Sequence, residues 1–135
     1  MKVAILVDGG YYRKRATHVL GKKSAKERSQ ELYDYCYKHL FSNKKSTSGD
    51  YLYRIFYYDC PPIDKQIFHP FSKKNIDFSK SETKKWTEEF FNELSQKRKV
   101  ALRLGNLNES ETVYQLSYDK LKKLLSRKIT LEDLK

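Results

Sequence analysis

Two aspartates in this sequence are placed where an α/β enzyme could hold a metal ion. Asp8 follows the apolar run of residues 3–7 and precedes two glycines, and Asp59 ends the aromatic run of residues 51–58. Ligands of parallel sheets bind outside the carboxyl ends of the strands. Carboxylates there can hold a hard cation such as Mg²⁺ against a phosphodiester. Asp8 is therefore predicted as a metal ligand, and Asp8 and Asp59 as catalytic residues.

Both aspartates also have a purely structural interpretation. Asp8 can cap the helix that begins after it, since Asp is a favoured N-cap residue. Asp59 can be a turn residue, because Cys60-Pro61-Pro62 follows it. The residues alone leave these alternatives open.

Tyrosines next to basic residues form a second candidate site. Such pairs can stack bases and neutralise phosphates, although tyrosines in the core and solvated lysines would give the same pattern. The predicted nucleic-acid-binding residues are Tyr11, Tyr12, Arg13, Lys14, Arg15 and Arg54, with Arg103 near the end of a third strand-like run.

Composition favours a polyanionic partner. The 135 residues contain 28 Lys and Arg against 17 Asp and Glu, a formal net charge of +11. Such an excess favours nucleic acid through counterion release. No apolar run is long enough to span a membrane, and no signal peptide is recognisable. Cys36 and Cys60 fit neither a disulfide framework nor a zinc site, so we expect reduced thiols in a cytoplasmic protein without a membrane partner.

Other familiar motifs are excluded by spacing. The run Gly21-Lys22-Lys23-Ser24 lacks the earlier glycine of a phosphate-binding loop, since residue 16 is alanine. His18, His39 and His69 have no Cys or acidic partners at metal-ligand spacing.

The elements that would position these residues alternate between strand and helix, as in βαβ units. The length of 135 residues predicts a single domain that spans residues 1–135. Apolar patterns predict strands over 2–7, 51–58 and 99–104, helices over 11–20, 24–41, 83–96 and 111–127, a polar loop over 42–50, an extended loop over 61–80, and a helix start at Thr130.

Three of these segments resemble an NYN domain of the PIN-like nuclease superfamily, closest to its bacterial branch. They are Val3 to Arg13 with its Asp8-Gly9-Gly10, Arg54 to Pro62 with its aromatic-Asp-x-Pro ending, and Val100 to Leu107 with an Arg-x-Gly-x-Leu pattern. The resemblance implies a three-layer α/β/α, Rossmann-like fold with a mainly parallel sheet. It also implies an RNA-cleaving pocket that uses Mg²⁺ or Mn²⁺, with Asp8 as the first metal ligand.

The sequence departs from the family at two places. Tyr11 stands where many relatives have Asn, and the later segments that supply the family's remaining acids are missing. We therefore expect the first two-thirds of such a domain, incomplete at the C-terminus. The alternatives are a non-catalytic RNA-binding module and an assembly protein that forms a homodimer or pairs with a partner chain.

Overall fold

The computed structural model describes residues 1–41 and 51–134. It divides the chain into two compact units, residues 1–63 with 80–107 and residues 64–79 with 108–135. The expectation of a single domain stays a prediction. The loop predicted over 42–50 lies outside the described residues. None of the described helices is long and apolar enough to cross a membrane.

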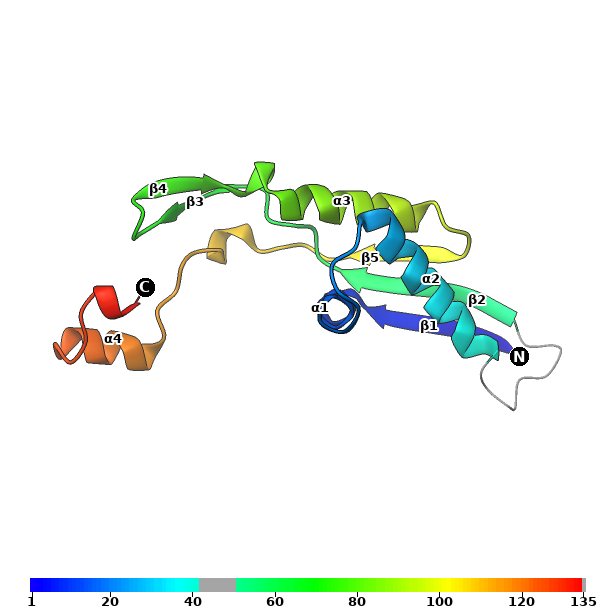
Figure 1. Cartoon of the computed structure of the whole chain (residues 1–135), viewed down its shortest axis with the longest axis horizontal. Helices are drawn as coiled ribbons and strands as arrows, with labels where there is room; N and C mark the ends of the chain where they lie inside the picture. Colours follow the sequence, from blue (N-terminus) through cyan, green and yellow to red (C-terminus); the bar gives the residue numbers. More distant parts are fainter. Residues whose placement is uncertain (42–50, 135) are drawn as a thin grey trace. The chain divides into compact units, whose positions relative to one another are not determined.

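A three-stranded parallel sheet forms the centre of the first unit (Figure 1). Its order is β1 (Lys2–Asp8), β2 (Tyr51–Asp59) and β5 (Val100–Leu104). The predicted strands are confirmed to within one residue at each end. The register shifts once, between Val3 and Ala4, and then places Asp8 opposite Tyr58. All three strands end at the same edge, as the parallel arrangement requires.

Three helices belong to the first unit: α1 (Gly9–Leu20), α2 (Ala25–Phe41) and α3 (Glu82–Ser95). Their predicted positions are confirmed, with starts that differ by one or two residues. Asp8 caps α1 and Ser81 caps α3, each through its side chain. The helices and one face of the sheet enclose the core, whose buried members are Ala25, Leu32, Cys36, Leu52, Ile55, Tyr57, Phe90, Phe91 and Leu94.

The opposite face of the sheet keeps large apolar side chains in contact with solvent. Leu6 is 67% exposed and Tyr58 46% exposed. Strand residues alternate between faces, so these two positions lie opposite to the buried Ile55 and Tyr57. The structure is a mixed α/β fold, and the predicted third layer stays a prediction.

The second unit corrects two expectations. Residues 61–80 are not a simple extended loop, because they contain an antiparallel hairpin of β3 (Gln66–His69) and β4 (Lys74–Asp77), in which Ile67 pairs with Ile76. The helix predicted over 111–127 is shorter than expected: α4 spans only Tyr118–Leu125. Ser117 ends the expected pattern, since its side chain accepts the Lys120 N–H as an N-cap.

Short 3₁₀ turns complete the described chain. They are η1 (Phe78–Lys80), η2 (Glu109–Glu111) and η3 (Glu132–Leu134). The helix start predicted at Thr130 becomes η3, and the Asp133 carboxylate accepts from the Thr130 N–H at 2.7 Å and from its hydroxyl at 3.0 Å.

Candidate functional site

Asp8 lies where β1 ends and α1 begins. One carboxylate oxygen, Oδ1, accepts the Tyr11 N–H at 3.1 Å and so caps the helix. The residue is otherwise exposed. The capping alternative is therefore confirmed, and it leaves the second carboxylate oxygen available to a ligand.

Asp59 is surrounded by donors at the end of β2. Two guanidinium nitrogens of Arg13 face this carboxylate. Nη2 lies 3.0 Å from Oδ1, and Nε lies 3.0 Å from Oδ2. The second of these is an ion-pair distance without hydrogen-bond alignment. Tyr57 donates its hydroxyl to Oδ2 at 2.9 Å, and the Cys60 N–H donates to Oδ1 at 2.8 Å. The Asp59 side chain is only 7% exposed.

The surroundings of Asp59 make it an organising residue. Burial, followed by the charge of Asp59, raises the pKa of the Tyr57 phenol well above its usual value. Tyr57 therefore remains a neutral donor, and Arg13 neutralises the carboxylate. The Arg13 Nη1 also lies 3.5 Å from the Thr87 hydroxyl, which links α1 to α3. The arrangement ties α1, α3 and the end of β2 together.

The two predicted catalytic carboxylates reach the same sheet edge on opposite faces. Asp8 pairs in register with Tyr58, and Asp59 pairs with Leu104. Because adjacent residues of a strand alternate in direction, Asp59 extends on the same side as buried Tyr57, whereas Tyr58 and its partner Asp8 lie on the other side. The register therefore does not support a pocket shared by the two carboxylates.

The carboxylate oxygens of Asp8 and Asp59 do not make a complete Mg²⁺ or Mn²⁺ site. Asp8 offers one available carboxylate oxygen, and both oxygens of Asp59 already accept hydrogen bonds. Among residues 1–41 and 51–134, His, Cys, Asp and Glu nowhere gather in threes as a metal site would need. Magnesium ions are usually bound through carboxylates together with several waters. Metal binding by Asp8 stays a prediction, as does a catalytic role for Asp59.

Helix α1 separates its predicted RNA-binding residues into two groups. Tyr11, Lys14 and Arg15 are exposed. Tyr12 is half-buried, and its hydroxyl lies 3.3 Å from Glu31 Oε1. Burial and the Glu31 charge raise the pKa of Tyr12. With Arg13 bound to Asp59, Tyr12 and Arg13 serve the fold, and the other three residues remain available to a ligand.

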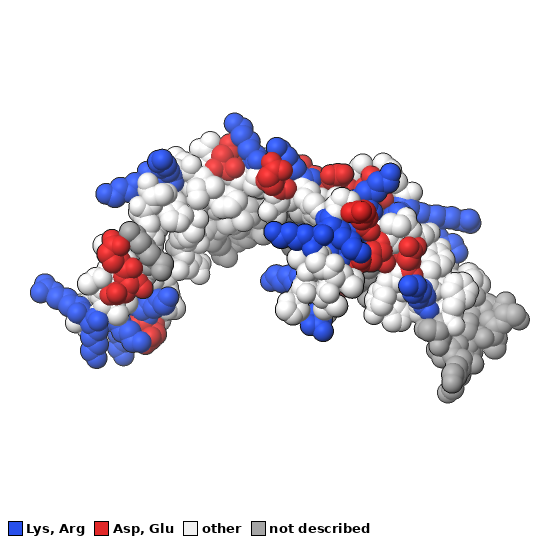
Figure 2. Space-filling model, in the orientation of Figure 1, with Lys and Arg blue, Asp and Glu red and all other residues white. Residues whose placement is uncertain are grey.

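The two remaining arginines belong to the exposed sheet face rather than to α1. Arg54 precedes the buried Ile55 in β2, so its side chain lies on the opposite, exposed face. Its guanidinium carbon lies 5.9 Å from the Tyr53 ring centroid. The Arg103 guanidinium carbon lies 5.5 Å from the centroid of Phe56. Both pairs have cation–π distances. More widely, basic side chains project from the visible surface of both units (Figure 2).

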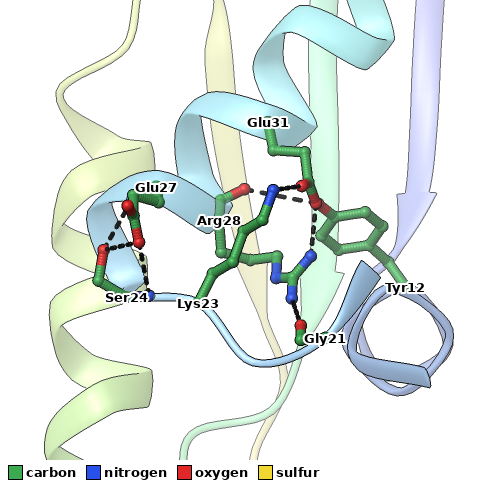
Figure 3. A network of polar contacts seen from close by, with 7 residues as sticks. All are labelled: Tyr12, Gly21, Lys23, Ser24, Glu27, Arg28 and Glu31. Atoms are coloured by element: carbon green, nitrogen blue, oxygen red, sulfur yellow. Dashed lines mark hydrogen bonds and ion pairs between the residues drawn. The ribbon is translucent and has the colours of Figure 1, made fainter. Parts of the chain in front are cut away.

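A polar network that the sequence interpretation missed joins α1 to α2 (Figure 3). Arg28, 1% exposed, donates to the Gly21 carbonyl and to Glu31 Oε1. Lys23 forms an ion pair with the other Glu31 oxygen. Burial acts to raise the pKa of Glu31, but hydrogen bonds and charges from Lys23 and Arg28 outweigh it and lower the pKa.

The sequence did contain a signal for part of this network. Ser24 and Glu27 have capping-box spacing. The Glu27 carboxylate accepts from the Ser24 N–H at 3.1 Å, and the Ser24 Oγ accepts from the Glu27 N–H at 3.2 Å. No sequence pattern indicates that Arg28 would be buried.

Comparison with known proteins finds no significant match to a family model, a curated protein or a solved structure.

Proposed function

We propose that this chain binds RNA through the exposed side chains of α1 at the carboxyl edge of the sheet. One observation carries the proposal: Tyr11, Lys14 and Arg15 are exposed on one helix, while the neighbouring Tyr12 and Arg13 are held by the fold. An aromatic ring beside two cations can stack a base and neutralise phosphates. The net charge of +11 favours the same partner.

Tyr11→Ala tests the base-stacking part of this proposal. We expect RNA affinity to fall roughly 5- to 150-fold, because a base–aromatic stack contributes about 1–3 kcal/mol. The helix cap survives the change, since only the Tyr11 backbone donates to Asp8. Fluorescence anisotropy with a labelled single-stranded RNA measures the affinity. Tyr118→Ala, which removes another exposed tyrosine from α4, is the control. Equal affinities of the two variants would contradict the proposal.

Variants of Asp8 distinguish RNA binding alone from metal-dependent RNA cleavage. Cleavage is the activity that the family resemblance implies. Asp8→Asn retains a capping oxygen but removes the charge, whereas Asp8→Ala also loses about 0.5–2 kcal/mol of capping. We expect the wild-type chain to bind RNA without cleaving it in Mg²⁺ or Mn²⁺, as judged by gel electrophoresis. Cleavage that is lost in Asp8→Asn would overturn the binding-only proposal and support the nuclease.

A second candidate function is assembly, and the exposed sheet face favours it. Leu6 and Tyr58 are 67% and 46% exposed, although parallel sheets are normally covered on both faces. β1 is also an edge strand, and such edges are prone to pair with other chains. We propose that a second copy of this chain covers this face, and a partner chain is the alternative outcome of the test described in the Discussion.

A further inference from the structure

A cavity of about 880 Å³ opens within the first unit, away from the exposed sheet face. Its walls come from α1, from the connection between α1 and α2, and from the first turns of α3. The side chains that matter for its chemistry are those of Lys14, His18, Lys22, Lys23, Thr83 and Trp86. All of them belong to the first unit.

The charge balance of this cavity is positive. Three of its cations already have acidic partners: Arg13 is paired with Asp59, and Lys23 and Arg28 are paired with Glu31. Lys14 and Lys22 are exposed, and no acidic partner is found for either within the described part of the chain. The cavity's acid, Glu82, lies 3.2 Å from the Lys85 ammonium. Two lysines are left to attract an anion.

The connection that carries Lys22 is held rigidly at the cavity wall. Gly21 adopts a positive φ of 77° and donates its N–H to the Thr17 carbonyl. Buried Arg28 donates to the Gly21 carbonyl from the other side (Figure 3). The Trp86 indole N–H donates to the Lys23 carbonyl at 3.0 Å. Lys22 is therefore presented from a backbone fixed on both sides of it, which lowers the entropy cost of binding.

An aromatic wall lies beside these cations. The Trp86 ring stacks on Phe90, with centroids 5.1 Å apart and an interplanar angle of 11°. It is half-buried and lines the cavity. Lysines can contact a phosphate, and an immobilised indole can contact a flat ring. A nucleotide carries both groups in one molecule.

We propose that this cavity binds the phosphate of a nucleotide, with Lys14 and Lys22 contacting the phosphate and Trp86 contacting the nucleoside. The inference rests on the proposed RNA binding for one source of that phosphate, a nucleic acid strand. A free mononucleotide has the same chemistry. Thus the Gly21-Lys22-Lys23-Ser24 run, which is not a phosphate-binding loop by its spacing, still supplies a phosphate ligand.

Titration of the intact chain with small probes tests the cavity directly. We expect uridine monophosphate to shift the backbone amide NMR signals of Lys22 and Thr83, inorganic phosphate to shift them less, and uridine to leave them unchanged. These shifts should be lost in the double variant Lys14→Gln/Lys22→Gln. Shifts spread over all exposed lysines, or no shifts, would overturn the proposal.

A charge-matched pair of variants tests the source of the phosphate. Lys2→Gln/Lys38→Gln removes two exposed lysines that do not line the cavity. We expect Lys14→Gln/Lys22→Gln to weaken single-stranded RNA binding at least tenfold more than this control. We also expect it to reduce the slope of log affinity against log salt by about 0.7, because both lysines contact one phosphate and each neutralised phosphate of a single strand contributes about 0.7.

The two experiments separate this inference from the proposed function. If the wild-type chain binds RNA and both double variants weaken it equally, RNA binding stands and a strand phosphate in the cavity is overturned. If the chain does not bind RNA but uridine monophosphate shifts the cavity signals, the proposed function fails and the cavity is a mononucleotide site. If neither ligand binds, both proposals fail.

Discussion

Among the glycines of residues 1–41 and 51–134, Gly9 is the one at which an added Cβ would meet the closest contact. A Cβ at this position would lie 2.4 Å from Tyr57 Cζ, and Tyr57 is fully buried. Gly9→Ala must therefore displace the Tyr57 ring from Asp59. We expect the free energy of unfolding to fall by about 1–3 kcal/mol, as for other overpacked cores. Urea unfolding followed by circular dichroism measures the change.

Gly10→Ala is the matched control for that substitution. A Cβ at Gly10 would meet only Asp8 Oδ1, at an ordinary contact distance of 3.7 Å. We expect unchanged or slightly increased stability, because alanine has the higher helix propensity. If Gly9→Ala were as stable as Gly10→Ala, the close contact between α1 and Tyr57 would be refuted.

The two thiols should differ sharply in reactivity. Cys36 is 2% exposed and burial raises its pKa to about 11, whereas Cys60 is exposed. The thiolate is the reactive form, so at neutral pH a thiol reagent should modify one cysteine rapidly. Cys60→Ser should abolish this rapid reaction and leave one thiol that reacts only after urea is added. Rapid reaction of Cys60→Ser in the folded state would contradict the buried position of Cys36.

At the scale of elements, the junction of α1 and α2 depends on one buried ion pair. Arg28→Met removes the donor to the Gly21 carbonyl and one of the two cations beside Glu31. We expect a loss of about 3 kcal/mol in the free energy of unfolding, because the Gly21 carbonyl loses its buried donor and Glu31 keeps only the partly exposed Lys23 as a cation. Lys23→Met is the control and should cost less than about 1 kcal/mol, since Lys23 is 38% exposed. Similar losses in both variants would mean that Arg28 has no special role.

The same junction predicts a dependence of stability on pH. The pKa of Glu31 is lower in the folded chain than its ordinary value of 4.5. Its contribution is therefore complete above pH 4.5 and is lost as the pH falls through the folded-state pKa. Urea unfolding at pH 6 and at pH 3 should show a larger loss for wild type than for Glu31→Gln. Parallel losses in the two proteins would show that Glu31 is not responsible.

Elements with a strong local signal were predictable, and those without one were not. β1 was recognisable because its apolar run ends at Asp8-Gly9-Gly10, and α3 because its aromatic residues recur at helical spacing. The β3–β4 hairpin was missed because its turn contains no glycine and uses Lys73 at a φ of 53°. The α4 start was missed because apolar periodicity continues upstream of the Ser117 cap.

At the scale of the whole molecule, the exposed sheet face predicts self-association. Leu6→Lys places a charge on that face, and burying this charge in an interface would be costly. We expect wild type to form dimers at increasing concentration in sedimentation experiments, and Leu6→Lys to remain monomeric. Leu125→Lys changes a leucine of α4 that is 76% exposed and should not affect association.

Other outcomes of the sedimentation experiment are equally informative. A wild-type chain that stays monomeric at all concentrations would refute the proposed homodimer. Self-association that survives in Leu6→Lys would place the interface elsewhere. A monomer that becomes a defined complex only with a second protein, and only while Leu6 is retained, would assign the face to a partner chain.

The sequence by itself determined the parallel α/β character of the first unit, because apolar runs and turn residues act over a few neighbouring positions. It also placed Asp8 and Asp59 at one sheet edge. Only the tertiary structure decided that these carboxylates lie on opposite faces and that Arg13 and Tyr57 donate hydrogen bonds to Asp59. It also decided that Lys14 and Lys22 line one cavity. Those outcomes depend on register and on packing between distant segments, and local patterns do not encode them.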